Sequence, residues 1–189
     1  MAEEQDWIEA ARQGDVDGWE RLVATHQQSI FRLAYLFLGD ADDAEDITQE
    51  TFIHAYRALN RFDSARPFRP WLMRIATNLC HNWHRSLRRY LGTLQNVLNN
   101  EPRPATILEQ AEHNVDMQNL WKAVNRLPLT DQKVIYLRYF LECSEVETAE
   151  VLGVALGTVK SRSHRALGRM RNVLLKEYPH LMQESSDVA

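Results

Sequence analysis

The stretch that decides the fold is Val146-Glu147-Thr148-Ala149-Glu150-Val151-Leu152-Gly153-Val154-Ala155-Leu156-Gly157-Thr158-Val159-Lys160-Ser161-Arg162. It predicts two short helices joined by a tight turn, because Ala149 is small enough for two helices to approach and Gly153 suits the turn. Val154 and Val159 then fall on the face that a packed pair of helices buries. This spacing is typical of a helix-turn-helix, whose second helix lies in the major groove of DNA.

Every charged side chain from Leu156 to Leu175 is basic. A helix surface of one sign is expected to face the opposite sign, and the phosphates of nucleic acid meet that requirement. Arginine and lysine can also bind O6 and N7 of guanine, and serine or threonine suit phosphates or bases. The alternative is a helix pair with a solvated basic surface. We predict DNA contacts near the start of the second helix, from Thr158, Lys160, Ser161, Arg162, His164 and Arg165.

Charge is distributed unevenly along the chain, whose net charge of −4 conceals two basic blocks. Residues 64–100 carry six arginines and no acid, and residues 156–175 carry five bases and no acid. By contrast, residues 1–63 contain 14 acids and 5 bases. Two acid-free blocks in an acidic chain indicate two anionic partners, or two sites on one polymer.

The composition and the spacing of apolar residues predict an all-α fold, since the chain has only 7 Gly and 6 Pro and its apolar residues recur at helical intervals. We expect a loop from Arg61 to Pro70, which contains two prolines. Thr130 is expected to cap the helix that it begins. The expected helices run from Asp6 to about Thr25 with a bend near Gly14, and over 30–38, 42–59, 71–91, 107–127 and 130–141.

The helical pattern fails between about Gly92 and Ala105, where asparagine and proline are frequent. Such a composition is typical of a flexible linker between domains. We therefore expect two small helical domains, the second containing the helix-turn-helix. Their predicted bounds are 1–91 and 118–178, with a linker at 92–117 and a polar tail at 179–189.

Aromatic and basic side chains alternate along residues 66–90, a pattern that suits single-stranded nucleic acid. Aromatic rings stack on unpaired bases while guanidinium groups follow the phosphates. We favour Phe68, on a loop flanked by prolines, as a stacking ring, and we expect the ring of Trp71 to lie in the core. The predicted contacts are Arg66, Phe68, Arg69, Arg74, Asn78, Asn82, Trp83 and Arg85.

Other features limit the classes of function. Cys80 and Cys143 are isolated, so neither a disulfide framework nor a zinc site is indicated. Cys80 with His81 and His84 could be imagined as metal ligands, but no carboxylate or further cysteine completes a site, and we predict no metal, no cofactor and no catalysis. The acidic first residues do not resemble a signal peptide, and no apolar run is long enough to span a membrane, which favours a cytoplasmic protein without membrane insertion.

Three blocks of the chain, in this order, resemble the extracytoplasmic-function sigma factors of bacterial RNA polymerase. The first two are Asp43–Phe52, an acidic helix that composition alone would leave as a solvated face, and Phe68–Asn78. The third comprises Leu127-Pro128, Val134–Tyr139 and Leu152–Arg162. The resemblance covers nearly the whole chain, and it implies a protein that directs core polymerase to promoters and that is held inactive by an anti-sigma factor until a stress or envelope signal arrives.

The resemblance also implies a role for each block. Asp43, Asp46, Gln49 and Glu50 would bind core polymerase. The loop from Phe62 to Arg69 and the face with Asn78, Asn82 and Arg85 would hold melted bases of the minus-ten element. Lys160, Ser161, Arg162 and Arg165 would bind the minus-thirty-five duplex.

The chain departs from the family pattern at several positions. Asn82 stands where an aspartate is frequent, and the 63–67 loop lacks the usual glycine, so the preferred bases are open. Thr148 and Ser163 occupy positions that are commonly aliphatic, and Ala155 replaces a frequent proline. The alternative function is a dimeric helix-turn-helix regulator that binds a palindrome without polymerase, which would leave residues 42–91 unexplained.

Overall fold

The computed structural model describes residues 2–94 and 115–180, with side chains at 3–85 and 119–180. Most of the predicted linker and polar tail, and the side chains of Arg88 and Arg89, lie outside this range. Helices form all the regular secondary structure of the described residues, and no strand occurs among them. The prediction of an all-α fold is therefore confirmed. The chain divides into two compact units.

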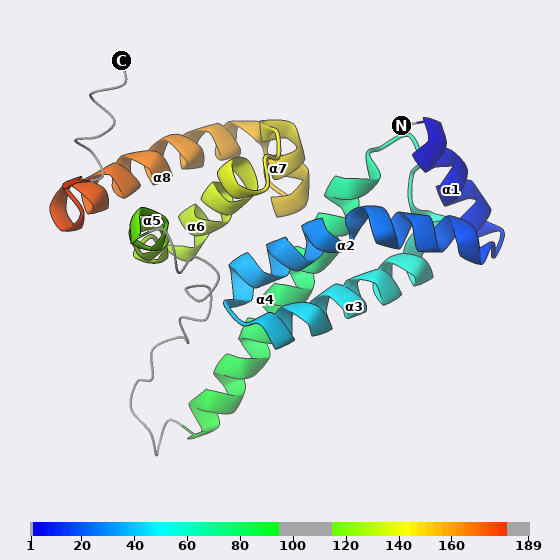
Figure 1. Ribbon diagram of the computed structural model, residues 1–189, viewed down its shortest axis with the longest axis horizontal. Helices are drawn as coiled ribbons and strands as arrows, with labels where there is room; N and C mark the ends of the chain where they lie inside the picture. Colours follow the sequence, from blue (N-terminus) through cyan, green and yellow to red (C-terminus); the bar gives the residue numbers. More distant parts are fainter. Residues whose placement is uncertain (1, 95–114, 181–189) are drawn as a thin grey trace. The chain divides into compact units, whose positions relative to one another are not determined.

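The first unit begins with two helices where the sequence predicted one bent helix. Gly14 has a φ of 89°, a left-handed conformation that glycine adopts at little cost, and it ends the first helix. Asp15 then caps the next helix by accepting a hydrogen bond from the backbone N–H of Gly18 at 3.2 Å. The helices of this unit are α1 (Ala2–Arg12), α2 (Val16–Leu38), α3 (Ala41–Ala58), the 3-10 turn η1 (Leu59–Arg61) and α4 (Phe68–Leu94). Figure 1 labels α1, α2, α3 and α4.

The long helix α2 forms the centre of the first unit, because it packs on α1, α3 and α4. Gly18 lets α1 approach closely, since an added Cβ would lie 2.9 Å from the carbonyl oxygen of Trp7. Each fully buried aliphatic side chain contributes about 1.5–3 kcal/mol to such a core. The buried core residues include Leu22, Ile30, Leu33, Ala44, Ile47, Ala55, Leu72, Met73 and Ala76.

The loop between η1 and α4 is shorter than predicted. The helix α4 already begins at Phe68, so Pro70 lies within its first turn and the prediction of a loop through Pro70 is wrong. Proline is tolerated there because the first N–H groups of a helix have no partner inside the helix. The loop therefore comprises residues 62–67.

The second unit contains the predicted helix-turn-helix. The first helix of this helix-turn-helix, α7, starts with a capping box that the sequence analysis overlooked. Ser144 Oγ accepts from the backbone N–H of Glu147, and Glu147 Oε2 accepts from that of Ser144. Gly153 occupies the turn with a φ of 64°. The elements of this unit are α5 (Val115–Asn125), α6 (Leu129–Ile135), the π-helical turn η3 (Tyr136–Phe140), α7 (Glu145–Leu152) and α8 (Leu156–Glu177).

The prediction that Thr130 caps α6 is wrong. The helix begins one residue earlier, at Leu129, and Pro128 in the cap position makes no side-chain hydrogen bond. The side chain of Gln132 stabilises this connection instead, because its amide donates to the carbonyl oxygens of Asn125 at 3.1 Å and Leu127 at 2.7 Å.

Candidate nucleic-acid interface

The helix α8 presents a polar face to solvent. Gly157, His164, Arg165 and Gly168 are three, four or seven residues from Ser161, so these five positions share one side of the helix. All five are exposed, as is Lys160. Val159, Ser163 and Ala166 are buried on the opposite side.

Two of the predicted contacts on α8 lie at the margin of this face, because Thr158 and Arg162 are half-buried. Arg171 is exposed, and it lies seven residues beyond His164 on the same side of α8. The sequence analysis did not include Arg171 among the predicted contacts. Its separation of seven residues from His164, about two helical turns, is the sequence signal that could have identified Arg171.

One basic side chain of α8, Arg169, is exposed but pairs with an acid of the same unit. Arg169 Nη1 lies 2.6 Å from Asp131 Oδ2, and the carboxylate is only 6% exposed. This ion pair joins α8 to α6, so part of the basic charge of α8 is matched within the unit. Lys160 Nζ lies 3.7 Å from Glu145 Oε2 on the surface, a distance that leaves the ammonium group accessible to a phosphate.

The packing beneath this face contains two polar atoms without partners. The hydroxyl groups of Thr148 and Ser163 are buried and make no hydrogen bond within the described residues. Both occupy positions where the sequence analysis noted an unusual polar residue.

On α4, four of the predicted contacts form a line. Arg74, Asn78, Asn82 and Arg85 are separated by four, four and three residues, so they share one face of the helix, and all four are exposed. Their guanidinium and amide groups can bind phosphates and the edges of unpaired bases. This line, here called the α4 stripe, is a candidate surface for single-stranded DNA.

The aromatic rings beside the α4 stripe have roles that differ from the prediction. Phe68 is only 1% exposed, and its ring packs against Phe62, His26 and Trp71 with centroids 5.3 to 5.5 Å apart. Phe68 is therefore a core residue, and its predicted stacking role is contradicted because tertiary contacts cover the ring. Trp71 is half-buried and thus more exposed than Phe68. The sequence analysis had favoured Phe68 as the stacking ring and placed Trp71 in the core, so the exposures of the two rings are the reverse of the prediction.

The remaining predicted contacts of this region differ in exposure. Arg66 is exposed and lies 3.5 Å from Asp63, whereas Arg69 is half-buried. Trp83 is half-buried, with its ring 5.3 Å from that of His84. His84 Nε2 donates to the carbonyl oxygen of Phe37 at 3.0 Å, so this histidine helps to join α4 to α2.

The acidic residues of α3 form a separate surface. Asp46, Gln49 and Glu50 are exposed, and Asp43 is half-buried. Burial raises the pKa of Asp43 above its usual value of 3.8, and the nearby charges of Asp40, Asp46 and Asp42 raise it further. These carboxylates concentrate negative charge in the first half of α3.

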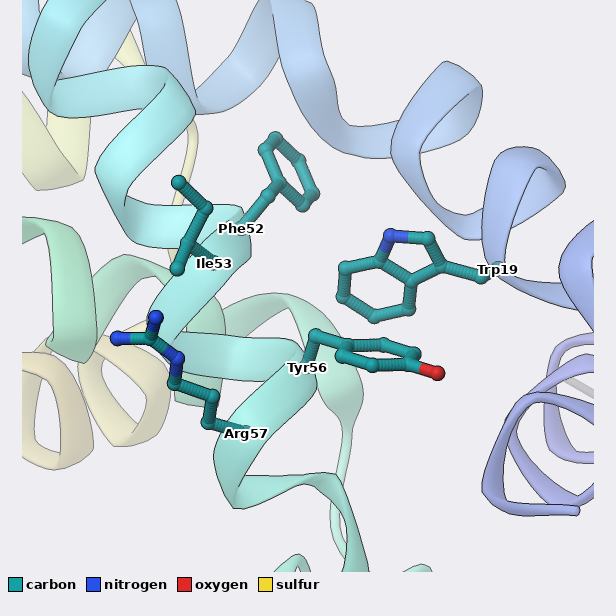
Figure 2. A pocket seen from close by; sticks show the side chains of 5 residues that line it. All are labelled: Trp19, Phe52, Ile53, Tyr56 and Arg57. Carbon is teal, nitrogen blue, oxygen red and sulfur yellow. The ribbon is translucent and has the colours of Figure 1, made fainter. Parts of the chain in front are cut away.

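The second half of α3 adds an apolar hollow that the sequence analysis missed. Figure 2 shows Trp19 of α2 facing Tyr56 of α3, with Phe52, Ile53 and Arg57 completing the lining. The hollow has a volume of about 350 Å³. The rings of Trp19 and Tyr56 lie 5.0 Å apart. Ile53 and Tyr56 are each 49% exposed. Both residues fall outside the set of positions that α3 buries. Apolar side chains at such positions of a helix are the sequence signal that could have revealed them.

Within the described residues, no helix is long and apolar enough to cross a membrane. Among the residues that the structure describes, no three His, Cys, Asp or Glu side chains lie together so that they could hold a metal ion. Cys80 is buried and His81 is exposed, so the two do not face the same environment.

Two family models match the chain. The model for sigma-70 region 2 matches residues 22–90, and the model for sigma-70 region 4 matches residues 117–170. These ranges contain the α4 stripe and the polar face of α8 respectively.

Curated relatives match most of the chain. The ECF RNA polymerase sigma factor SigW of Bacillus subtilis (strain 168) is 35% identical, over 88% of this chain and 94% of the relative. The ECF RNA polymerase sigma factor SigE of Mycolicibacterium smegmatis is 31% identical, over 96% of this chain and 76% of the relative.

The fold is also similar to a solved structure, that of CnrH in complex with the cytosolic domain of CnrY. The TM-score is 0.71 and the identity 28%, over 93% of this chain and 99% of the solved chain.

Proposed function

The chain belongs to the extracytoplasmic-function group of bacterial RNA polymerase sigma factors, and we propose that its two units hold one promoter at two points. A sigma factor directs core polymerase to promoters. In this proposal residues 1–91 bind polymerase and the minus-ten element, residues 118–178 bind the minus-thirty-five element, and residues 92–117 link them. The observation that carries the proposal is that each unit presents an exposed face of basic and polar side chains.

The α3 surface is the proposed docking site for core polymerase. Asp46, Gln49 and Glu50 would meet a basic partner surface, and oppositely charged surfaces accelerate association and fix its orientation. The apolar hollow beside Tyr56 would add buried area to these polar contacts. Only contacts that exclude water strengthen such an interface substantially.

The polar face of α8 is the proposed reader of intact duplex. A recognition helix contacts base edges through its N-terminal residues, where Lys160, Ser161 and Arg165 are exposed. Arg171, farther along the helix, suits a phosphate contact that fixes register without reading sequence.

The α4 stripe is the proposed site for melted DNA. Unstacking a base costs a few kcal/mol, which contacts to the separated strand must offset. The amides of Asn78 and Asn82 can both donate and accept, so they can bind base edges, while Arg74 and Arg85 follow the backbone.

Neither unit needs to bind DNA tightly alone, because the second contact forms at a high effective concentration once the first is made. We propose recruitment and strand separation without bond chemistry by this chain, in the cytoplasm where polymerase acts. We also propose control by an anti-sigma factor that covers these surfaces, a proposal supported by the likeness to CnrH, which was solved with the cytosolic domain of CnrY.

Start-site sequencing after transcription in vitro tests the proposal. Purified bacterial core polymerase with the chain, supplied with fragmented genomic DNA, should begin RNA at a limited set of sites that share two upstream elements. Core polymerase alone should not. If the chain adds no defined start sites but binds a palindrome as a dimer, the regulator alternative replaces this proposal.

A further inference from the structure

The first helix contacts the 62–67 loop, which the family resemblance assigns to the melted bases of the minus-ten element and which we include in the proposed site for melted DNA. Helix α1 precedes the residues matched by the region 2 family model, which begin at residue 22. Arg12, near its end, nevertheless reaches the loop region. Its Nε donates to the carbonyl oxygen of Leu59 at 3.2 Å, and its Nη2 donates to that of Phe62. Gln5 Nε2 also donates to the carbonyl oxygen of Ser64 at 3.3 Å.

The two carbonyl groups that Arg12 binds belong to the first residue of η1 and to the first residue of the 62–67 loop. One guanidinium group binds both of them, and its planar fork restricts their relative orientation. The two ends of the loop are fixed by buried rings, because Phe62 and Phe68 are 5% and 1% exposed with centroids 5.3 Å apart. Arg12 therefore adds a third point of attachment, on the α1 side.

The loop between these anchors has a defined local turn and an exposed tip. Asp63 Oδ1 accepts from the backbone N–H of Ala65 at 3.1 Å, and the carbonyl oxygen of Asp63 accepts from that of Arg66 at 2.9 Å. Residues 63–67 are all exposed. The tip is therefore free to meet a ligand, while its base is held from within the unit.

Arg12 itself is poorly placed to bind DNA. Its side chain is only 19% exposed, and Glu9 Oε2 lies 3.4 Å from its Nη1, which offsets its charge. Its donors are directed to backbone oxygens of this chain.

We propose that Arg12 is a positioning residue for base capture, holding the 62–67 loop in the shape that receives the unpaired minus-ten base. This inference rests on the proposed function of that loop. A binding loop that is already in its bound shape avoids the ordering cost, and a small displacement of its contacts weakens recognition steeply.

The test compares Arg12→Ala and Arg12→Lys with the unchanged chain, each assembled with core polymerase. The measurement is affinity for single-stranded minus-ten oligonucleotides that carry each of the four bases at the captured position. Arg12→Ala should lose about 10-fold in affinity for the preferred base, and its preference over the other bases should fall towards one. Arg12→Lys should retain part of the preference, because lysine supplies donors without the planar fork.

Arg21→Ala is the matched control, since the Arg21 guanidinium lies 5.9 Å from the Trp7 ring centroid and joins α2 to α1. It removes the same charge, and it should leave base preference unchanged. Thermal midpoints and binding to upstream duplex should be recorded for all variants.

An unchanged base preference in Arg12→Ala would overturn the inference, and so would an equal loss in Arg21→Ala. If Arg12→Ala does not fold, Arg12→Lys decides, because an unaltered preference there overturns the inference and a reduced one supports it. Failure of the unchanged chain to bind any minus-ten strand would instead refute the proposed function of the loop.

Discussion

Thr148 illustrates how one atom can matter in the helix-turn-helix. Its side chain is fully buried, and its hydroxyl makes no hydrogen bond within the described residues. Leaving such a group without a partner costs about 1–3 kcal/mol, whereas an apolar group of the same shape carries no such cost. The position therefore reduces the stability of the unit that we propose reads duplex DNA.

Thr148→Val should raise the free energy of unfolding of the second unit by about 1 kcal/mol, because it replaces the hydroxyl with a methyl group of similar size. Denaturant unfolding measured by circular dichroism checks this. Thr130→Val, at an exposed position of α6, is the control and should change stability little. A lower stability for Thr148→Val would mean that the hydroxyl has a partner that this account lacks.

Asp46→Lys should prevent assembly with core polymerase while the thermal midpoint of the chain stays within a few degrees. Asp46 is exposed on α3, so reversing its charge alters a surface and not the core. A like charge facing a basic partner should reduce affinity at least about 10-fold, equivalent to 1.4 kcal/mol. Co-elution on a sizing column measures assembly. Asp6→Lys, an equal reversal on the exposed part of α1, should leave co-elution unchanged, and normal co-elution of Asp46→Lys would contradict the docking site.

The exposure of single residues on a helix face follows from local pattern, whereas burial by tertiary contacts does not. Arg74, Asn78, Asn82 and Arg85 share one face of α4 and are exposed, and their contacts with DNA stay a prediction. The burial of Phe68 depends on His26 of α2 and Phe62 of the loop as well as on Trp71 of its own helix, and no local pattern reveals the first two contacts.

At the scale of elements, the turn of the helix-turn-helix depends on one glycine. The left-handed φ of Gly153 costs other residues about 1–2 kcal/mol. Gly168 lies within α8, and an added Cβ there would meet nothing within 4 Å. The same substitution should therefore have opposite effects at the two positions.

Gly153→Ala should lower the free energy of unfolding of the second unit by about 1–2 kcal/mol, and Gly168→Ala should raise it by about 0.8–1 kcal/mol. Chemical denaturation of both variants under one set of conditions gives the comparison. Equal signs for the two changes would contradict the assigned turn.

The basic side chains of α8 should separate into those that bind DNA and those that stabilise the unit. Arg165→Ala should weaken binding to the upstream duplex and leave folding intact, since the side chain is exposed. Arg169→Ala should instead destabilise the unit by about 2 kcal/mol, because Asp131 loses its partner in a buried position. Gel-shift titration with the upstream element and thermal unfolding distinguish the two. A DNA defect without destabilisation in Arg169→Ala would refute this division.

The presence of a helix was easier to predict than the residues at which it begins and ends. The periodicity of apolar residues correctly predicted helix over most of residues 42–59 and 71–91, whereas it missed that residues 26–29 continue the helix α2. The predicted start of α6 was wrong because the side chain of Gln132 stabilises this connection in place of a threonine cap. The start of α4 was wrong because Pro70 was treated as excluding helix.

At the scale of the whole molecule, the prediction that the chain forms two helical units agrees with the structure. The prediction rested on the uneven charge and on the loss of helical periodicity after Leu91, which are properties of long segments and do not depend on single contacts. Residues 95–114 lie outside the described range, so the linker stays a prediction. The part of Trp19 in the apolar hollow could not be anticipated, because it requires Trp19 and Tyr56 to meet from different helices.

The central claim is that one unit holds separated strands while the other holds intact duplex on the same promoter. Permanganate reactivity combined with hydroxyl-radical footprinting, on a promoter bound by core polymerase and this chain, tests it directly. The account predicts reactive, unpaired thymines at the minus-ten element together with a protected and unreactive duplex at the minus-thirty-five element. Unreactive thymines at the first element, or no protection at the second, would contradict it.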